Sequence, residues 1–329
     1  MAAEGEGGMN MSHPAAEASA REVAPSSRLE EVLSAGRFAV TAEMASPDSS
    51  NPEDVLANIA PLVGHVDAIN VTDGSGANAH IASLAASAII ARAGHTPVMQ
   101  MTCRDRNRIA IQADLVGAAA LGINTLLCLG GDDVKAGDHP DAKPVFDLDG
   151  TSLIKAARTL CDGQYLSGRK LTHPPRLFIG APENPFMAPL EGRLEKLKAR
   201  IEVGAQFVQT QFCFDIALLR QFMTRAVELG LDRRCSILVG VGPLASARTA
   251  RWMRSNIPGV HIPDATIERM ETSADPAAEG RRICVEMMQQ IREVKGVAGV
   301  HIMAIRQERW IGELVQSSGV LGGRRAGAA

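Results

Sequence analysis

The chain has 329 residues, of which 46% are hydrophobic and 22% are charged, so it has enough apolar material for one large core. The formal net charge is −3, and the short cluster Arg104, Arg106 and Arg108 is interrupted by Asp105 and Asn107. No apolar run approaches the roughly 20 residues that span a bilayer, so we expect neither a nucleic-acid partner nor a membrane partner.

Six cysteines stand at positions 103, 128, 161, 213, 235 and 284, without a CxxC pair and without a group of histidines near them. Two of them, Cys128 and Cys213, lie in apolar runs that are typical of buried strands. We therefore expect reduced core thiols of a cytoplasmic protein, and neither disulfides nor a metal site.

The two ends of the chain differ in composition from the part between them. Residues 1–27 are rich in Ala, Gly, Glu and Ser and lack the apolar stretch of a signal peptide, so we expect a disordered leader. Residues 321–329 are expected to form a flexible tail. The remaining residues, 28–320, are expected to fold as one catalytic domain, because barrel domains commonly take about 250 residues.

Short β-type runs alternate with longer helical patterns along this domain. The β-type runs lie at 37–45, 66–73, 96–103, 125–131, 176–183, 207–214, 236–242 and 299–305. Helical patterns lie at 52–62, 79–93, 107–121, 151–160, 191–203, 216–229 and 245–256, near 265, at 276–295, and in a last helix that ends near 316. Strict alternation of this kind predicts a parallel sheet.

Eight such repeats favour closure of the sheet into a barrel. An open doubly wound sheet usually carries a GxGxxG motif after its first strand, whereas the first run here ends in Glu-Met-Ala-Ser-Pro. We therefore predict an α/β fold of the (β/α)8 TIM-barrel type, with a parallel eight-stranded barrel. The segment 132–150 is longer than most connections and is a candidate functional loop.

Catalytic groups of such barrels gather at the C-terminal ends of the strands. The polar residues at the predicted strand ends are Glu43, Thr72, Asp73, Gln100, Thr102, Asp132, Glu183, Asn184, Gln209, Gln211 and Arg306. The seventh run ends with Gly240 and Gly242, and we expect these glycines to let the backbone approach a ligand closely.

Three of the polar residues suggest chemistry. Glu43 lies within a strand, where burial would raise its pKa and make it a general acid; an outward side chain that pairs with a helix Lys or Arg is an equal alternative. Asp132 follows two glycines and is either a catalytic carboxylate or a turn or capping residue. Gln211 lies in an apolar run, where its amide either binds a heterocycle with alternating donors and acceptors or is a satisfied core amide.

Seven motifs give the chain a resemblance to a known family. In chain order they are FAVTAEM, INVTDGSGAN, MQMTCRDRN, LGINTLLCLGGD, PVFDLDG, FIGAPENPF and LKARIEVGAQFVQTQFCFD. Over residues 37–306 the chain thereby resembles the methylenetetrahydrofolate reductases, and it is most similar to their short, single-barrel bacterial type. The resemblance implies a (β/α)8 barrel that passes a hydride from NAD(P)H through FAD to 5,10-methylenetetrahydrofolate and forms 5-methyltetrahydrofolate.

The resemblance also implies roles for individual residues. Glu43 would be the general acid that protonates N10 and opens the folate ring, and Asp132 would contact the pterin beside the flavin and stabilise the iminium cation. The implied flavin contacts are Thr72, Gln100, Thr102, Gly130, Gly131, Asp132, Ala181 and Arg200. The implied folate contacts are Gln211, Phe214 and Arg306.

Three positions depart from the family pattern, and these changes reduce the number of expected flavin contacts. Gln100 stands in place of a histidine, Gly130 in place of an arginine and Ala181 in place of a tyrosine. The alternatives are therefore a flavin-free reductase with direct hydride transfer, a methyltransferase that uses methyltetrahydrofolate, and a silent folate-binding subunit. The expected partners are small folate and nicotinamide substrates. The sequence leaves open the choice of NADH or NADPH, and whether the chain forms a homo-oligomer.

Overall fold

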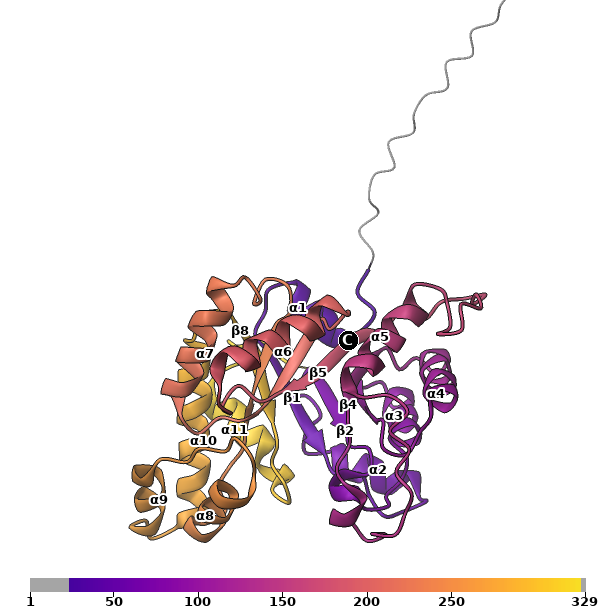
Figure 1. The fold of residues 1–329 in the computed structure, drawn as a ribbon. Coiled ribbons are helices and arrows are strands. Elements are labelled where there is room, and N and C mark those ends of the chain that lie inside the picture. Colours follow the sequence, from indigo (N-terminus) through magenta and orange to yellow (C-terminus); the bar gives the residue numbers. More distant parts are fainter. Residues whose placement is uncertain (1–23, 327–329) are drawn as a thin grey trace, which may run out of the picture.

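A closed barrel of eight parallel strands forms the centre of the molecule (Figure 1). The computed structural model describes residues 24–326, so most of the expected leader and the last three residues of the expected tail lie outside the described residues. The strands are β1 (Ala39–Met44), β2 (Ala68–Val71), β3 (Pro97–Thr102), β4 (Thr125–Leu129), β5 (Phe178–Glu183), β6 (Phe207–Phe212), β7 (Ser236–Val241) and β8 (Val297–Ile302). They pair in chain order and β8 closes on β1, so the predicted TIM barrel is confirmed.

Helices cover the outside of the barrel, as Figure 1 shows. They are α1 (Arg28–Ser34), α2 (Pro52–Ile59), α3 (Ser83–Arg92), α4 (Arg108–Ala120), α5 (Gly150–Cys161), α6 (Leu190–Glu202), α7 (Ile216–Glu228), α8 (Ala247–Asn256), α9 (Asp264–Glu271), α10 (Pro276–Arg292) and α11 (Ile311–Ser318). Several begin at a side chain that accepts a hydrogen bond from the first turn, such as Asn51 for α2 and Asp215 for α7. Within residues 24–326 no helix is both long and apolar enough to cross a bilayer.

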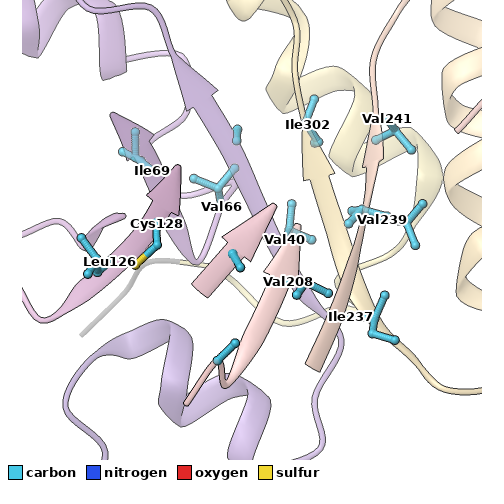
Figure 2. Packing of buried hydrophobic residues seen from close by; sticks show 14 of the residues in the cluster. Val40, Val66, Ile69, Leu126, Cys128, Val208, Ile237, Val239, Val241 and Ile302 are labelled. Atoms are coloured by element: carbon cyan, nitrogen blue, oxygen red, sulfur yellow. The ribbon is translucent and has the colours of Figure 1, made fainter. Parts of the chain in front are cut away.

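The side chains of each strand alternate between two environments. In β1, Val40, Ala42 and Met44 point outward into the apolar cluster between the barrel and its helices. Thr41 and Glu43 point to the barrel interior, where they contact residues of other strands. Figure 2 shows part of the outward cluster, with valine, leucine and isoleucine side chains from several neighbouring strands. Every second strand residue is therefore available to the interior.

Apolar side chains close the end of the barrel at which the strands begin. Helix α1 packs there against inward-facing strand residues, among which the rings of Phe178 and Phe207 stack with centroids 4.9 Å apart. The helix begins after Ser27, whose hydroxyl accepts a hydrogen bond from the Glu30 amide at 3.3 Å. The sequence patterns above do not include this helix, although Ser27 and Glu30 stand at the spacing of a capping box.

The last described residues contact the same closed end. Arg324 donates to both carboxylate oxygens of Asp67, at 2.5 and 2.6 Å, and to the carbonyl of Phe38. Asp67 also accepts a hydrogen bond from the Val40 amide at 2.9 Å. A buried carboxylate needs such partners. Residues 321–326, which the sequence assigns to the flexible tail, therefore include a residue that is bonded to the barrel.

Candidate active site

A cavity of about 300 Å³ opens at the end of the barrel where the strands finish, which we call the barrel mouth. Its walls come from β1, β3, β4, β5, β6, β8 and the neighbouring helix α6. The lining residues are Glu43, Gln100, Leu127, Leu129, Pro182, Glu183, Asn184, Arg193, Arg200, Gln209, Thr210, Gln211, His301 and Met303. Catalytic groups of TIM barrels lie at this end, so the cavity is the candidate active site.

Glu43 forms part of the cavity wall, and its carboxylate accepts a hydrogen bond from Gln100 Nε2 at 3.0 Å. The side chain points inward, so the alternative of an outward Glu43 that pairs with a helix cation is wrong. Burial raises the pKa of the Glu43 carboxyl; the bond from Gln100 lowers it in part, and the charge of Glu308 raises it further. A carboxyl that holds its proton toward neutral pH can act as a proton donor.

Strand β6 places three consecutive side chains in the cavity wall, those of Gln209, Thr210 and Gln211. A regular strand would turn the middle side chain away, but the pairing of β6 with β7 shifts its register between Gln209 and Phe212. Gly240 of β7 makes room for this irregularity, because a Cβ there would lie 2.3 Å from the Thr210 carbonyl oxygen. The neighbouring strand fills the space that a side chain at Gly240 would take, and the expected approach of a ligand at Gly240 and Gly242 stays a prediction.

Only one of the two polar atoms of the Gln211 side-chain amide is hydrogen-bonded to the protein. Its Oε1 accepts a hydrogen bond from the Phe212 amide at 3.0 Å. Its Nε2 has no hydrogen-bond partner within residues 24–326, and the side chain lines the cavity. An amide with an uncommitted donor at a cavity wall can bind an acceptor on a ligand. This arrangement supports the heterocycle-binding interpretation over that of a satisfied core amide.

The wall formed by β5 and α6 carries charge. Glu183 is buried, and Nη1 of Arg200 lies 2.6 Å from its carboxylate and also donates to the Pro182 carbonyl. Burial raises the pKa of Glu183, and Arg200 lowers it in part. Arg193, two turns earlier on α6, lines the same wall and forms no ion pair among the described residues. A guanidinium in that position favours an anionic group on the ligand.

Buried polar side chains cross the barrel interior beneath the cavity. Asn70 and Gln209 exchange two amide hydrogen bonds, of 2.6 and 3.0 Å. Gln209 Nε2 also donates to the Thr41 hydroxyl at 3.0 Å, and that hydroxyl lies 3.0 Å from Nδ1 of His301. Each side chain is held by at least one other, so the network fixes their orientations.

The loops after β2 and β4 form a different arrangement. Asp73 is buried and accepts hydrogen bonds from the Thr102 hydroxyl at 2.9 Å and from two nitrogens of Arg106 at 2.7 and 3.1 Å. Asp132 is exposed and accepts a hydrogen bond from the Gly76 amide at 2.9 Å. The polar groups on this side bond to one another, and none of these five residues lines the cavity.

The cavity brings together four of the predicted site residues, namely Glu43, Gln100, Arg200 and Gln211. The predicted residues that do not line it are Thr72, Thr102, Gly130, Gly131, Asp132, Ala181, Phe214 and Arg306. Among these, Thr72, Thr102 and Asp132 are bonded to other protein groups beside the cavity. Their implied roles stay predictions.

Local packing explains several of these placements. Ala181 lies in the apolar cluster outside β5, and Phe214 lies in a second apolar cluster beside α8 and α9. The Thr72 hydroxyl donates to Ser46 Oγ at 3.1 Å. Arg306 follows the end of β8 with a φ of 58° and lies beside a separate hollow near α2. The implied ligand contacts of these four residues are not met in this cavity.

Three polar cavity residues, His301, Arg193 and Thr210, are absent from the prediction. His301 lies inside β8 rather than at its end, so an inspection of strand ends passes over it. Its neighbours Val300 and Ile302 are both fully buried in the outward cluster, and period-two alternation could have turned His301 inward. Arg193 lies on a helix, and no strand pattern points to it.

The lining of the cavity does not fit a flavin. It contains no Phe, Tyr or Trp side chain that could stack on an isoalloxazine ring. Its volume of about 300 Å³ stands at the lower limit of the roughly 300–1,000 Å³ of ligand pockets, which suits a single fused ring system. Two predicted flavin contacts, the hydroxyls of Thr72 and Thr102, already donate to Ser46 and Asp73.

The sequence profile described as methylenetetrahydrofolate reductase matches residues 28–319, which is almost the whole barrel. The chain belongs to the methylenetetrahydrofolate reductase family. The resemblance inferred from the motifs is thereby confirmed. The chain is 26% identical over 243 residues to a probable methylenetetrahydrofolate reductase (NADPH) of Caenorhabditis elegans, and 23% identical over 230 residues to methylenetetrahydrofolate reductase 1 of Schizosaccharomyces pombe.

These two alignments cover 72% and 68% of the chain but 34% and 36% of the relatives, so this family member spans about a third of their length. A solved structure with the same fold is an uncharacterized protein from Clostridium thermocellum that binds two copies of 5-methyl-5,6,7,8-tetrahydrofolic acid. Its TM-score is 0.65 at 12% identity, over 89% of this chain and 99% of that one. EDTA monooxygenase from Chelativorans sp. BNC1 has a TM-score of 0.52 at 9% identity, over 87% and 95% of the two chains. At these identities the likeness shows the fold alone.

Proposed function

We propose that the chain reduces 5,10-methylenetetrahydrofolate to 5-methyltetrahydrofolate, with NAD(P)H as the hydride source. The observation that carries the proposal is Glu43, a half-buried carboxyl with a raised pKa that accepts a hydrogen bond from Gln100 at the wall of the cavity. Opening of the folate ring requires a proton donor, and a carboxyl whose pKa is raised is a suitable one.

In the proposed reaction Glu43 gives its proton to N10 of the folate, and the bond between N10 and the one-carbon unit breaks. The product of this step is a cation in which the one-carbon unit is joined to N5 by a double bond. A hydride from the dihydronicotinamide adds to this carbon, which becomes the methyl group, while NAD(P)H becomes NAD(P)⁺. Glu43 regains its proton from water, so each turnover consumes one proton and one hydride.

Other features of the cavity support a folate. The uncommitted Nε2 of Gln211 can donate to a pterin acceptor. Arg193 on the charged wall suits the carboxylates of a glutamate tail or the phosphates of a dinucleotide. The protein from Clostridium thermocellum that shares the fold binds 5-methyltetrahydrofolic acid, the product of the proposed reaction.

Direct hydride transfer from NAD(P)H to the folate is the route that the cavity supports, because its lining has no aromatic side chain for a flavin. A route through FAD is the second candidate, since reductases of this family typically use FAD. The visible spectrum of the purified protein separates the two routes. Direct transfer requires turnover without a flavin band, whereas a flavin band that NADH bleaches would favour the FAD route.

The test of the proposal is turnover by the full chain, with oxidation of NADH and NADPH followed by absorbance and 5-methyltetrahydrofolate measured by chromatography. We expect oxidation of one nicotinamide to depend on methylenetetrahydrofolate and to match the methyl product one to one. Methyl transfer from 5-methyltetrahydrofolate to a thiol or corrinoid, without nicotinamide oxidation, would replace the proposal with the methyltransferase alternative. Folate binding without any turnover would favour a silent subunit.

A further inference from the structure

His301 lies on β8 at the floor of the cavity, with 3% of its surface exposed. Its Nδ1 lies 3.0 Å from the Thr41 hydroxyl. Its other ring nitrogen, Nε2, makes no hydrogen bond within residues 24–326 and is not sealed inside the protein, since the ring lines the cavity. This nitrogen is therefore available to a ligand.

The position of the ring proton follows from the network beneath the cavity. Gln209 Nε2 has two protons, which it donates to Asn70 Oδ1 and to Thr41 Oγ1, both at 3.0 Å. Thr41 then has one proton to donate, either to Nδ1 of His301 at 3.0 Å or to the Val300 carbonyl at 3.5 Å. Hydroxyl hydrogen bonds are typically about 2.5–3.0 Å long, so the proton goes to Nδ1. The neutral ring therefore carries its own proton on Nε2.

The ring also stays uncharged. Burial lowers the pKa of His301 to about 3, so the imidazole is neutral throughout the range in which an enzyme of this kind works. The charged side chains on the same cavity are Glu43, Glu183, Arg193 and Arg200. A neutral imidazole donates a hydrogen bond without giving up its proton, and it adds no positive charge beside the cation of the proposed reaction.

We propose that His301 binds the folate by donating a fixed hydrogen bond from Nε2 to a carbonyl oxygen or ring nitrogen of the pterin. The identity of the ligand rests on the proposed function, whereas the donor itself rests on the network. Thr41, Gln209 and Asn70 orient the ring before the ligand arrives, so little conformational freedom is lost on binding. His301 and Gln211 thus provide two donors, which select a ring system rich in acceptors.

Two substitutions at the same position separate ligand binding from structural support. His301→Gln places an amide nitrogen near the position of Nε2, so it keeps a donor for the ligand and gives up the bond to Thr41. His301→Asn keeps a partner for Thr41 near the position of Nδ1 and removes the donor. We expect kcat/KM for methylenetetrahydrofolate to fall about 10- to 100-fold in His301→Asn and much less in His301→Gln. A purely structural role predicts the reverse order, with His301→Gln the less active and the lower melting.

Two readouts do not need turnover. Calorimetric titration of the full chain with 5-methyltetrahydrofolate should show the same order of weakening in Kd. Nitrogen-15 NMR of the ligand-free protein should show a neutral His301 with its proton on Nε2. A proton on Nδ1, or equal folate binding by wild type and both variants, overturns the proposal for His301. If the wild type shows the expected tautomer but neither binds nor reduces folate, the proposed function and the folate ligand are overturned. The assignment of Nε2 of His301 as a hydrogen-bond donor would then still hold.

Discussion

The two sides of the barrel mouth contain similar residues in opposite situations. On the side of β1, β6 and β8, Glu43, Gln211 and His301 each present a polar group to an open cavity. In the loops after β2 and β4, Asp73 and Asp132 also follow strand ends, but both oxygens of Asp73 bond to Arg106, Oδ2 of Asp132 accepts a bond from Gly76, and neither side chain lines the cavity. Both sets of residues follow strand ends at the mouth of the barrel, and only the first set lines the cavity.

The difference shows that residue type at a strand end does not identify a site. A buried carboxylate that is bound by a guanidinium costs free energy to release, so we expect Asp73 to stabilise the fold and not to take part in chemistry. An uncommitted polar atom that faces open space has no such cost. The hydrogen-bond partner of each polar atom therefore identifies a site better than the residue type does. Four substitutions on the two sides of the mouth test this difference.

The largest effect is expected for Glu43→Gln. If Glu43 supplies the proton to N10, its loss should lower methylenetetrahydrofolate reduction by about a hundredfold to ten-thousandfold. The amide preserves the size of the side chain, so 5-methyltetrahydrofolate should still bind in calorimetry and the melting temperature should change little. Turnover near that of the wild type would show that the proton comes from another group.

The next largest effect concerns stability on the opposite side. Arg106→Met leaves the buried Asp73 without its guanidinium partner and should lower the free energy of unfolding by about 3–5 kcal/mol. Arg108→Met is the matched control two residues away, because its ion pair with Asp147 is exposed and should contribute little. Denaturant titration of both variants measures the difference. Equal losses would contradict the assignment of Asp73 to the fold.

A smaller effect is expected in the pH dependence of Gln100→Met. The bond from Gln100 favours the charged form of Glu43 and so lowers its pKa; without it the pKa should rise further. A general acid loses activity as the pH rises through its pKa, so the alkaline fall in kcat/KM should move to higher pH in the variant. If the alkaline fall in kcat/KM stays at the same pH or moves to lower pH, Gln100 does not set the pKa of the general acid.

The smallest effect is expected for Asp132→Asn. Asparagine can accept the same hydrogen bond from the Gly76 amide. The rate of turnover should therefore stay within about twofold of the wild type, and the free energy of unfolding should change little. The role that the family resemblance implies, stabilisation of the iminium cation, predicts a loss of about a hundredfold in rate instead. Steady-state folate reduction by this variant decides between the two, and a large loss would place Asp132 in the reaction despite its distance from the cavity lining.

The fold could be predicted because the sequence pattern of a strand followed by a helix occurs eight times. Eight alternations of strand and helix contribute independently, and an error in one boundary leaves the topology unchanged. Helix α1 escaped prediction because it is a single short element outside the repeats. The contact of Arg324 with Asp67 escaped because it joins residues far apart in the chain, and no local pattern carries that information.

The candidate site could be predicted in part. Glu43 and Gln211 follow from strand alternation and from the family motifs, and both lie in the cavity. Gln100 also lies there and donates a hydrogen bond to Glu43, while its implied flavin contact stays a prediction. The commitment of Asp73 to Arg106, and of Thr72 to Ser46, depends on tertiary contacts, so residue type alone could not distinguish these groups from those that face a ligand.

The contact between Arg324 and Asp67 has a practical consequence. It holds Arg324 at the closed end of the barrel, where helix α1 also packs, opposite the mouth (Figure 1). The described part of the chain therefore begins and ends on the face away from the cavity. A tether attached to an exposed position of α1 should keep the mouth open to substrate, and a tether attached to α2 beside the mouth should not.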